Sequence, residues 1–330
     1  MMEQLSRHAS WFGILLLYMG LGAAPEPVLA QSYPSDMIRI VVGGAAGTPT
    51  DTITRIVANE LGQSEGWRMV VENKPGAIGT IAATEVLKQP ADGHTIFGIA
   101  LPTTAAPALL PNISFRLDVD FAPLIKLITS HHVLVVNPSV PAKSMAERVA
   151  LLKEHPDKFT FSSGGFGTPA HLSGELFKLH TGVRAAHVPY RALPQAIGDL
   201  VNGTNHYQFI TALPVLDLIA AGKLRALAVT APTRMPSLKD VPSVAEEGFP
   251  QLVIQEWVGL VVKSGTPDPI IARLNEATNK ALAKPSVREA LQKIAAEPAG
   301  GSPGEFSAHV NSQIAYWGKV VRDSGIKIRE

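Results

Sequence analysis

The chain of 330 residues contains no cysteine and is poor in charge. Without cysteine, no disulfide bond, thiolate nucleophile or cysteine-based zinc site can form. Charged residues make up 17% of the chain, and the formal net charge of +1 produces no field that would draw it to nucleic acid or anionic lipid. We therefore expect no nucleic-acid partner.

Motifs for common kinds of catalysis are missing or incomplete as well. No G-x-x-x-x-G-K-[ST] stretch is present, which excludes a P-loop, and the histidines are scattered without an H-E-x-x-H. Ser162 and Ser163 precede His171, but no local pattern provides the positioned base and oxyanion hole that a serine nucleophile needs. We expect no catalytic residue, no metal site and no cofactor.

The N-terminal residues follow the pattern of a secretory signal peptide. Arg7 precedes an apolar run over 11–24, helix breakers follow at 25–27, and residues 28–30 (V-L-A) place small or apolar side chains at the −3 and −1 positions of a cleavage site. The run is short for a membrane span of ~20 residues, and no other segment is apolar enough to cross a bilayer. We expect cleavage after about Ala30, with a retained membrane anchor as the alternative.

Beyond residue 33, runs typical of strands alternate with segments typical of helices. The β-branched and aromatic runs lie at 37–42, 67–71, 95–99, 133–136, 158–161, 207–210, 224–229 and 258–262. After the first run, Ile53, Val57 and Leu61 share one helical face, and Gly62 is expected to end that helix. This alternation predicts mostly parallel sheets covered by helices, and the chain length suggests two domains.

The C-terminal part has a different pattern. Three helical segments, at 269–283, 286–295 and 303–324, follow one another with no predicted strand between them. Residues 302–305 (S-P-G-E) form a capping box with proline at the first helical position. A helical tail of this kind can pack back onto the first α/β unit.

Two glycine-rich turns share one design. Residues 43–51 (G-G-A-A-G-T-P-T-D) follow the first predicted strand and open a helix, with Thr48 as N-cap and Pro49 at N1. Asp51 then falls at N3, where its carboxylate can accept a hydrogen bond from the Thr48 amide. Residues 162–171 (S-S-G-G-F-G-T-P-A-H) repeat the arrangement after a later strand, with Thr168 as N-cap.

Such turns can bind an anion without lysine or arginine. Glycine lets backbone N–H groups approach a ligand closely, and the helix N-terminus adds unpaired donors and a partial positive charge. Open α/β sheets bind ligands at the carboxyl ends of their strands, where both turns lie. Ordinary turn chemistry is the alternative, since the chain has 28 glycines and 26 prolines; we interpret the third G-T-P, at 265–267, in that way.

Two further features have alternative interpretations. In the stretch H-V-P-Y-R after a short strand, Tyr190 can donate a hydrogen bond to a ligand and Arg191 can pair bidentately with a carboxylate. A surface turn with a core tyrosine explains the stretch equally well. Trp257 is either an aromatic wall of the site or part of the core, and we favour the core.

An ordered set of motifs across almost the whole chain, from about residue 33 to 327, resembles the Bug family. These proteins are the substrate-binding receptors of tripartite tricarboxylate transporters. The matching segments are 33–34, 51–55 (D-x-x-x-R), 71–77, 90–95, 120–123, 134–138, 163–168, 171–177, 187–190, 221–230, 240–246 and 317–321.

The resemblance implies an α/β fold of the type II periplasmic binding protein class, with two lobes, a hinge of two crossovers and a helical C-terminal tail on lobe one. We expect a signal peptide at 1–30, lobe one at 31–132 plus 255–330, and lobe two at 133–254. The family implies a periplasmic protein whose cleft holds a small carboxylate through backbone amides, hydroxyls and waters. It also implies delivery to a membrane permease of one large and one small subunit, and we expect the receptor to be a monomer.

The chain departs from the family pattern at three places. Gly43-Gly44 stands where a Pro-Phe pair is common, and Gly47-Thr48 replaces a Gly-Gly pair. Arg191-Ala192 replaces Lys-Gly, and residues 210–212 (I-T-A) stand where an aspartate is frequent. A roomier and less acidic pocket would accept an aromatic or longer dicarboxylate, which is our hypothesis for the ligand.

We therefore predict a solute-binding receptor that closes on its ligand and is not an enzyme. The expected ligand-binding residues are Ala46, Gly47, Thr48, Asp51, Thr103, Ser163, Gly164, Thr168, His171, Tyr190, Arg191 and Thr211. Asp51 is expected to brace its loop through the cap and need not touch the ligand. Two alternatives stay open: a periplasmic hydrolase or transferase, which would need a nucleophile–base pair in the cleft, and a sensor receptor that delivers its ligand to a signalling partner.

Overall fold

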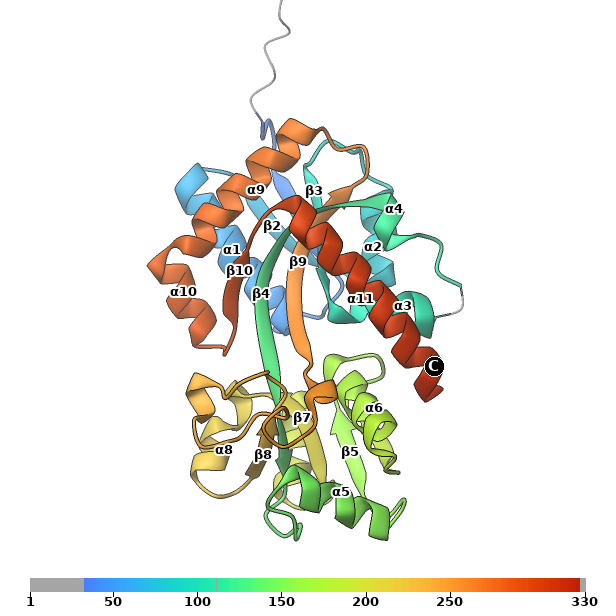
Figure 1. The fold of residues 1–330 in the computed structure, drawn as a ribbon. Helices are drawn as coiled ribbons and strands as arrows, with labels where there is room; N and C mark the ends of the chain where they lie inside the picture. The colour runs from blue at the N-terminus through green and yellow to red at the C-terminus, as the bar shows by residue number, and fades with distance from the viewer. Residues whose placement is uncertain (1–32, 111, 327–330) are drawn as a thin grey trace, which may run out of the picture. The chain divides into compact units, whose positions relative to one another are not determined.

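The computed structural model describes residues 33–110 and 112–326, in which strands and helices alternate over most of the chain (Figure 1). The predicted signal peptide lies outside the described residues. Within them, every helix is too short or too polar to cross a membrane.

A first group of strands pairs around β1 (Ile38–Val42). β1 is parallel to both β2 (Met69–Asn73) and β3 (Thr95–Ala100), and β3 is antiparallel to β9 (Gln255–Lys263). β9 in turn pairs with the first part of the long strand β4 (Phe121–Val136), whose other edge binds β10 (Glu297–Gly300). The apolar side chains of β1 are almost fully buried, as expected for a parallel strand covered on both faces.

A second group pairs around the end of β4. That part of β4 is antiparallel to β7 (Tyr207–Thr211) and β8 (Arg225–Val229). β5 (Thr160–Ser163) is parallel to β7 and to β6 (Ala186–Pro189). The continuous order is β2-β1-β3-β9-β4-β7-β5-β6, and β4 with β9 links the two groups, as their side-by-side course in Figure 1 illustrates.

Helices join and cover these strands. Their bounds are α1 (Pro49–Glu65), α2 (Thr80–Leu87), α3 (Leu101–Leu109), α4 (Leu117–Asp120), α5 (Met145–Glu154), α6 (Pro169–Thr181), α7 (Leu193–Val201), α8 (Leu216–Ala220), α9 (Asp268–Ala283), α10 (Pro285–Gln292) and α11 (Pro303–Ser324), with 3-10 turns η1 (Ala77–Gly79), η2 (Leu213–Val215), η3 (Pro236–Leu238) and η4 (Pro250–Leu252). α1 packs against α9 and α10, whereas α11 packs against α3 and β4. The helices thus bury their apolar faces on both groups of strands.

Large aromatic side chains fill the core beneath α11. Trp257 and Trp317 are each 1% exposed, and the Trp257 ring meets the edge of Phe306 at a centroid distance of 5.7 Å. The interpretation of Trp257 as a core residue is therefore confirmed.

The structure corrects several predicted boundaries. α1 does not end at Gly62 but continues to Glu65, and Gly66 terminates it with a left-handed φ of 70°. β4 begins twelve residues before its predicted start. The H-V-P of 187–189 belongs to β6 and does not follow it.

The tail also contains a strand that its sequence did not predict. β10 lies between α10 and α11, and Pro298 pairs with Ile128 of β4. Its sequence, E-P-A-G, has no β-branched residue, so its extended form comes from tertiary pairing and not from local propensity. α10 correspondingly ends at Gln292 instead of 295.

Candidate functional site

The predicted site residues lie at the carboxyl ends of parallel strands. Ala46, Gly47, Thr48 and Asp51 follow β1, and Thr103 follows β3, which is parallel to β1. Ser163, Gly164, Thr168 and His171 follow β5; Tyr190 with Arg191 follows β6; and Thr211 ends β7. Each group therefore sits at the edge of its sheet where open α/β folds bind ligands. We call residues 43–48 loop one and residues 163–168 loop two.

In loop one, a tight turn leads into α1. Gly47 has a φ of 79°, a conformation that a side chain would strain, and its amide donates to Asp51 Oδ2 at 2.9 Å. Thr48 is the N-cap in backbone conformation, but its hydroxyl donates to Ala45 O at 2.8 Å and does not cap α1. The prediction that Asp51 accepts from the Thr48 amide is wrong by one residue, because the turn aims the Gly47 amide at the carboxylate and the Thr48 amide at Ala45 O.

Asp51 is the anchor of loop one. Besides the Gly47 amide, its carboxylate accepts from Arg55 Nε at 2.9 Å and from Asn73 Nδ2 at 2.8 Å, and the residue is 3% exposed. Burial alone would raise the pKa of this carboxyl, but the hydrogen bonds from Arg55, Gly47 and Asn73 hold it below its usual value. Asn73 also donates to Gly44 O at 2.9 Å, so the end of β2 is tied to the loop.

Loop two repeats this construction with a histidine in place of the aspartate. Gly167 has a φ of 72°, and its amide donates to Nδ1 of His171 at 3.1 Å. The Thr168 hydroxyl donates to Gly165 O at 2.7 Å and accepts from the His171 amide at 3.4 Å, so Thr168 caps α6 as predicted. In both loops, the residue at N3 therefore accepts a hydrogen bond from the glycine that precedes the N-cap threonine.

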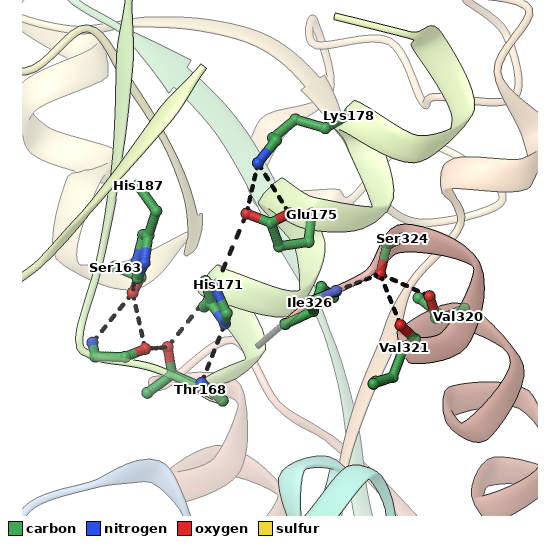
Figure 2. Close-up of polar contacts among 12 residues, drawn as sticks. Ser163, Thr168, His171, Glu175, Lys178, His187, Val320, Val321, Ser324 and Ile326 are labelled. Atoms are coloured by element: carbon green, nitrogen blue, oxygen red, sulfur yellow. Dashed lines mark hydrogen bonds and ion pairs between the residues drawn. The ribbon is translucent and has the colours of Figure 1, made fainter. Parts of the chain in front are cut away.

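A second histidine packs against loop two (Figure 2). His187 Nε2 lies 2.6 Å from Ser163 Oγ, and the ring centroids of His171 and His187 are 4.2 Å apart. Burial, aided by nearby Lys178, lowers the pKa of His171 to about 4. Burial, with His171 and Lys178 also nearby, lowers the pKa of His187 to about 3. Both rings are consequently neutral at pH 7, which suits His171 as a hydrogen-bond acceptor.

The two helix N-termini leave backbone donors unused. Within the described part of the chain, the amides of Thr50 and Asp51 in the first turn of α1 have no hydrogen-bond acceptor. The same is true of the amides of Phe166 and Ala170 in and after loop two. Free N–H groups at a helix N-terminus attract an anion.

The electrostatic surroundings of the two loops differ. α1 carries the ionised Asp51 in its first turn, whereas the first turn of α6 contains no acidic residue. A carboxylate near a helix N-terminus offsets the partial positive charge there. The positive end of α6 is therefore the less neutralised of the two.

One segment beside loop one was missed as a site component. Residues 76–79, after β2, all have positive φ, including 56° at Ile78, which is rare for a β-branched residue. A Cβ added to Gly43 would lie 2.5 Å from Gly79 Cα, so this segment packs directly on loop one. The letters P-G-A-I-G mark a turn, but they give no sign of where it packs.

The other predicted residues occupy varied settings. Thr103 is 6% exposed, and its hydroxyl accepts from the Ala100 amide at 3.3 Å. The Tyr190 hydroxyl donates to Asp199 Oδ2 at 2.8 Å, which ties β6 to α7. Arg191 is exposed and makes no hydrogen bond or ion pair within the described residues, and Thr211 is half-buried. Their roles toward a ligand stay predictions.

The described residues give little support for a metal site, a hydrolase site or a ligand site in another cavity. Within residues 33–110 and 112–326, no group of three histidine, aspartate or glutamate side chains could hold a metal ion. The letters G-G-S-P-G at 300–304 match the nucleophile-elbow pattern, but Ser302 is the N-cap of α11 in a capping box with Glu305. Two cavities, of about 330 and 390 Å³, are lined by residues outside both loops.

Comparison with known proteins identifies the class and then the family. The mixed α/β fold matches solved periplasmic binding proteins. The sequence model described as "Tripartite tricarboxylate transporter family receptor" (TctC) matches residues 53–326, and the chain belongs to this family of solute-binding receptors. The resemblance to the Bug family is thereby confirmed, since the chain is 32% identical to Protein BugT of Bordetella pertussis over 327 residues, 98% of this chain and 99% of BugT.

Two solved structures extend this comparison. The R. palustris protein Rpa4515, solved with adipate, has a TM-score of 0.80 and 32% identity, covering 90% of this chain and 100% of that one. MatC from Rhodopseudomonas palustris, solved with bound malate, has a TM-score of 0.78 and 32% identity, covering 88% of this chain and 100% of that one.

Proposed function

We propose that this protein captures a small dicarboxylate between loop one and loop two and delivers it to a tripartite tricarboxylate-type permease. It acts in the periplasm as a monomer after removal of residues 1–30, without a catalytic step. Lobe one consists of 31–132 plus 255–330, and lobe two of 133–254.

The matched construction of the two loops carries this proposal. Each loop is fixed by a hydrogen bond from a glycine amide to the N3 side chain, Asp51 in one loop and His171 in the other. Each loop also leaves first-turn amides without an acceptor in the described structure. Two rigid donor sets, one on each group of strands, suit a ligand with a polar group at each end.

The charge difference between the loops suggests how the ligand is oriented. Asp51 already offsets the N-terminal charge of α1, whereas the first turn of α6 contains the neutral imidazole of His171 and no acidic residue. We propose that loop two binds one carboxylate directly and that loop one binds the other end through amides and hydroxyls or through water. Arg191 lies in the connection between β6 and α7, next to loop two. Its free guanidinium is available for a second charged contact with the ligand.

The neighbours and the departures from the family pattern support a dicarboxylate. Rpa4515 and MatC carry adipate and malate in their structures. In this chain, residues 210–212 offer no acidic group that would select an amino group. The absence of the Pro-Phe pair opens no space at Gly43 itself, because a Cβ there would lie 2.5 Å from Gly79 Cα.

A thermal-shift screen of the mature chain tests the proposal. The ligands are adipate, malate, terephthalate, citrate and glutamate. A ligand at a hundredfold excess over its Kd adds about 2.7 kcal/mol to native-state stability, enough for a clear rise in Tm. We expect rises with adipate or terephthalate that Thr168→Val removes, because this change eliminates the hydroxyl that caps α6.

His180→Gln is the matched control, since His180 is exposed near the other end of α6. A rise with glutamate alone would contradict the dicarboxylate proposal. A rise that persists unchanged in Thr168→Val would place the ligand away from loop two.

A further inference from the structure

A buried polar cluster lies where β4 exchanges its partners. β4 pairs with β9 as far as His131 and with β7 from His132 onward. The return connection passes the same point, because the Thr230 amide donates to His132 O at 2.8 Å and the Ile254 amide donates to Thr230 O at 3.0 Å. A change of angle between the two groups of strands must therefore be absorbed by the backbone at these residues.

The side chain of Thr230 joins both crossing segments. Its hydroxyl accepts from the His132 amide at 2.9 Å and donates to Ile254 O at 3.1 Å, and the residue is 0% exposed. A hydroxyl thus stands where a regular ladder would place a backbone carbonyl. The two crossing segments are connected through one side-chain oxygen, so the two groups of strands can rotate relative to each other about this point, which we call the pivot.

The His132 ring connects this pivot to loop two. Nε2 lies 2.6 Å from Glu256 Oε1 on β9, and Nδ1 lies 3.1 Å from Ser173 Oγ on α6. His132 is 3% exposed, and α6 is the helix that begins at loop two. Since the Ser173 hydroxyl can donate or accept, the ring bridges α6 and β9 whether or not it is protonated.

We propose that His132, through Ser173 and Glu256, is a positioning residue that sets the angle between the two groups of strands and couples that angle to loop two. The inference rests on the proposed function, because it assigns the closing motion of the receptor to this cluster. A ligand on loop two moves α6, Ser173 carries the movement to the His132 ring, and Glu256 carries it to β9. The ligand itself touches none of these residues.

Distance measurements on the mature chain test this role directly. Because the protein has no cysteine, Asn59→Cys and Glu154→Cys, on exposed positions of α1 and α5, place one spin label on each group of strands. The distance distribution is recorded without ligand for the parent protein and for Ser173→Ala, Glu256→Ala and Glu256→Gln. His180→Gln, exposed on α6, is the control.

We expect both alanine variants to shift or broaden the ligand-free distribution. Glu256→Gln retains an oxygen that accepts from His132 Nε2 and should restore the parent distribution, as should the control. With adipate as the probe, the alanine variants should raise Kd at least about fivefold, the lower end of ordinary coupling between sites.

One result would overturn the proposal. If the alanine variants fold, as judged by circular dichroism, and give the parent distance distribution while only their Tm falls, the role of the cluster is purely structural. If an alanine variant does not fold, Thr230→Ser is compared with the parent protein as a milder change. Loss of the methyl group alone should then broaden the distribution. If the parent protein fails to bind adipate, the proposed ligand is wrong, but the ligand-free distributions still decide the role of His132.

Discussion

Replacing His171 with asparagine should remove a defined part of the acid sensitivity of this protein. The Oδ1 atom of asparagine can take the place of Nδ1 and accept from the Gly167 amide, so loop two keeps its bond at neutral pH. The titrating ring is lost. The variant therefore separates the hydrogen bond from the proton chemistry.

The size of the effect follows from the position of the pKa. His171 is 3% exposed, and burial lowers its pKa from 6.5 to about 4. Between these values the unfolded chain binds a proton that the folded chain rejects, so the free energy of unfolding rises with pH across this window. The contribution of His171 is complete above pH 6.5 and is lost as the pH falls to about 4, a total of about 3 kcal/mol.

Urea unfolding followed by tryptophan fluorescence measures this quantity. We expect the parent protein to lose about 2 kcal/mol more than His171→Asn between pH 7.5 and pH 5, since each pH unit in the window is worth about 1.4 kcal/mol. His187 is present in both proteins, and because burial is the main cause of its lowered pKa and His171 only a smaller one, most of its contribution cancels in the difference. Parallel pH dependences of the two proteins would refute the reasoning that His171 is held neutral as an acceptor.

Three other substitutions test separate parts of the structure. Asp51→Asn should lower the free energy of unfolding by about 1–3 kcal/mol at pH 7. Because the pKa of Asp51 is lowered in the folded protein, this difference should shrink only below pH 3.8, the ordinary pKa of an aspartate, and a difference that already vanishes at pH 6 in urea titrations would be incompatible with this. Gly43→Ala should lower the free energy of unfolding by about 1–3 kcal/mol, because the new Cβ meets Gly79 Cα at 2.5 Å. Gly164→Ala, which places its Cβ in open space, should change it by no more than about 0.5 kcal/mol. Equal melting temperatures of the two variants would argue against the packing of 76–79 on loop one. The Arg148 guanidinium is fully buried between the Phe159 and Tyr207 rings without a hydrogen bond in the described residues. Arg148→Met should therefore leave the free energy of unfolding unchanged or raise it, and a loss above about 2 kcal/mol in urea unfolding would contradict this.

The sequence predicted those parts of the molecule in which local chemistry and tertiary structure agree. The β-branched runs became strands, and the two G-T-P turns became helix starts with the predicted Pro at N1. The design shared by the two loops was recognisable in the sequence itself. That Asp51 and His171 perform the same task, however, appeared only from the hydrogen bonds of Gly47 and Gly167.

Tertiary pairing determines what the sequence could not predict. β10 is extended only because β4 offers it an edge, and the first half of β4 contains a proline at 123 and lysine at 126 that obscure its strand pattern. Asn73 lies beyond the predicted strand at 67–71, yet it holds Gly44 and Asp51 together. The positive φ values at 76–79 accompany the packing of Gly79 against Gly43, which lies more than thirty residues earlier in the chain.

Hydrogen–deuterium exchange of the mature chain, with and without the dicarboxylate that gives the largest rise in Tm, tests the two-loop account most directly. The free amides of Thr50, Asp51, Phe166 and Ala170 report on both loops. We predict that ligand slows exchange in both 43–51 and 163–171 and leaves α9 unchanged. Protection confined to one loop, or binding without protection in either loop, would contradict the account.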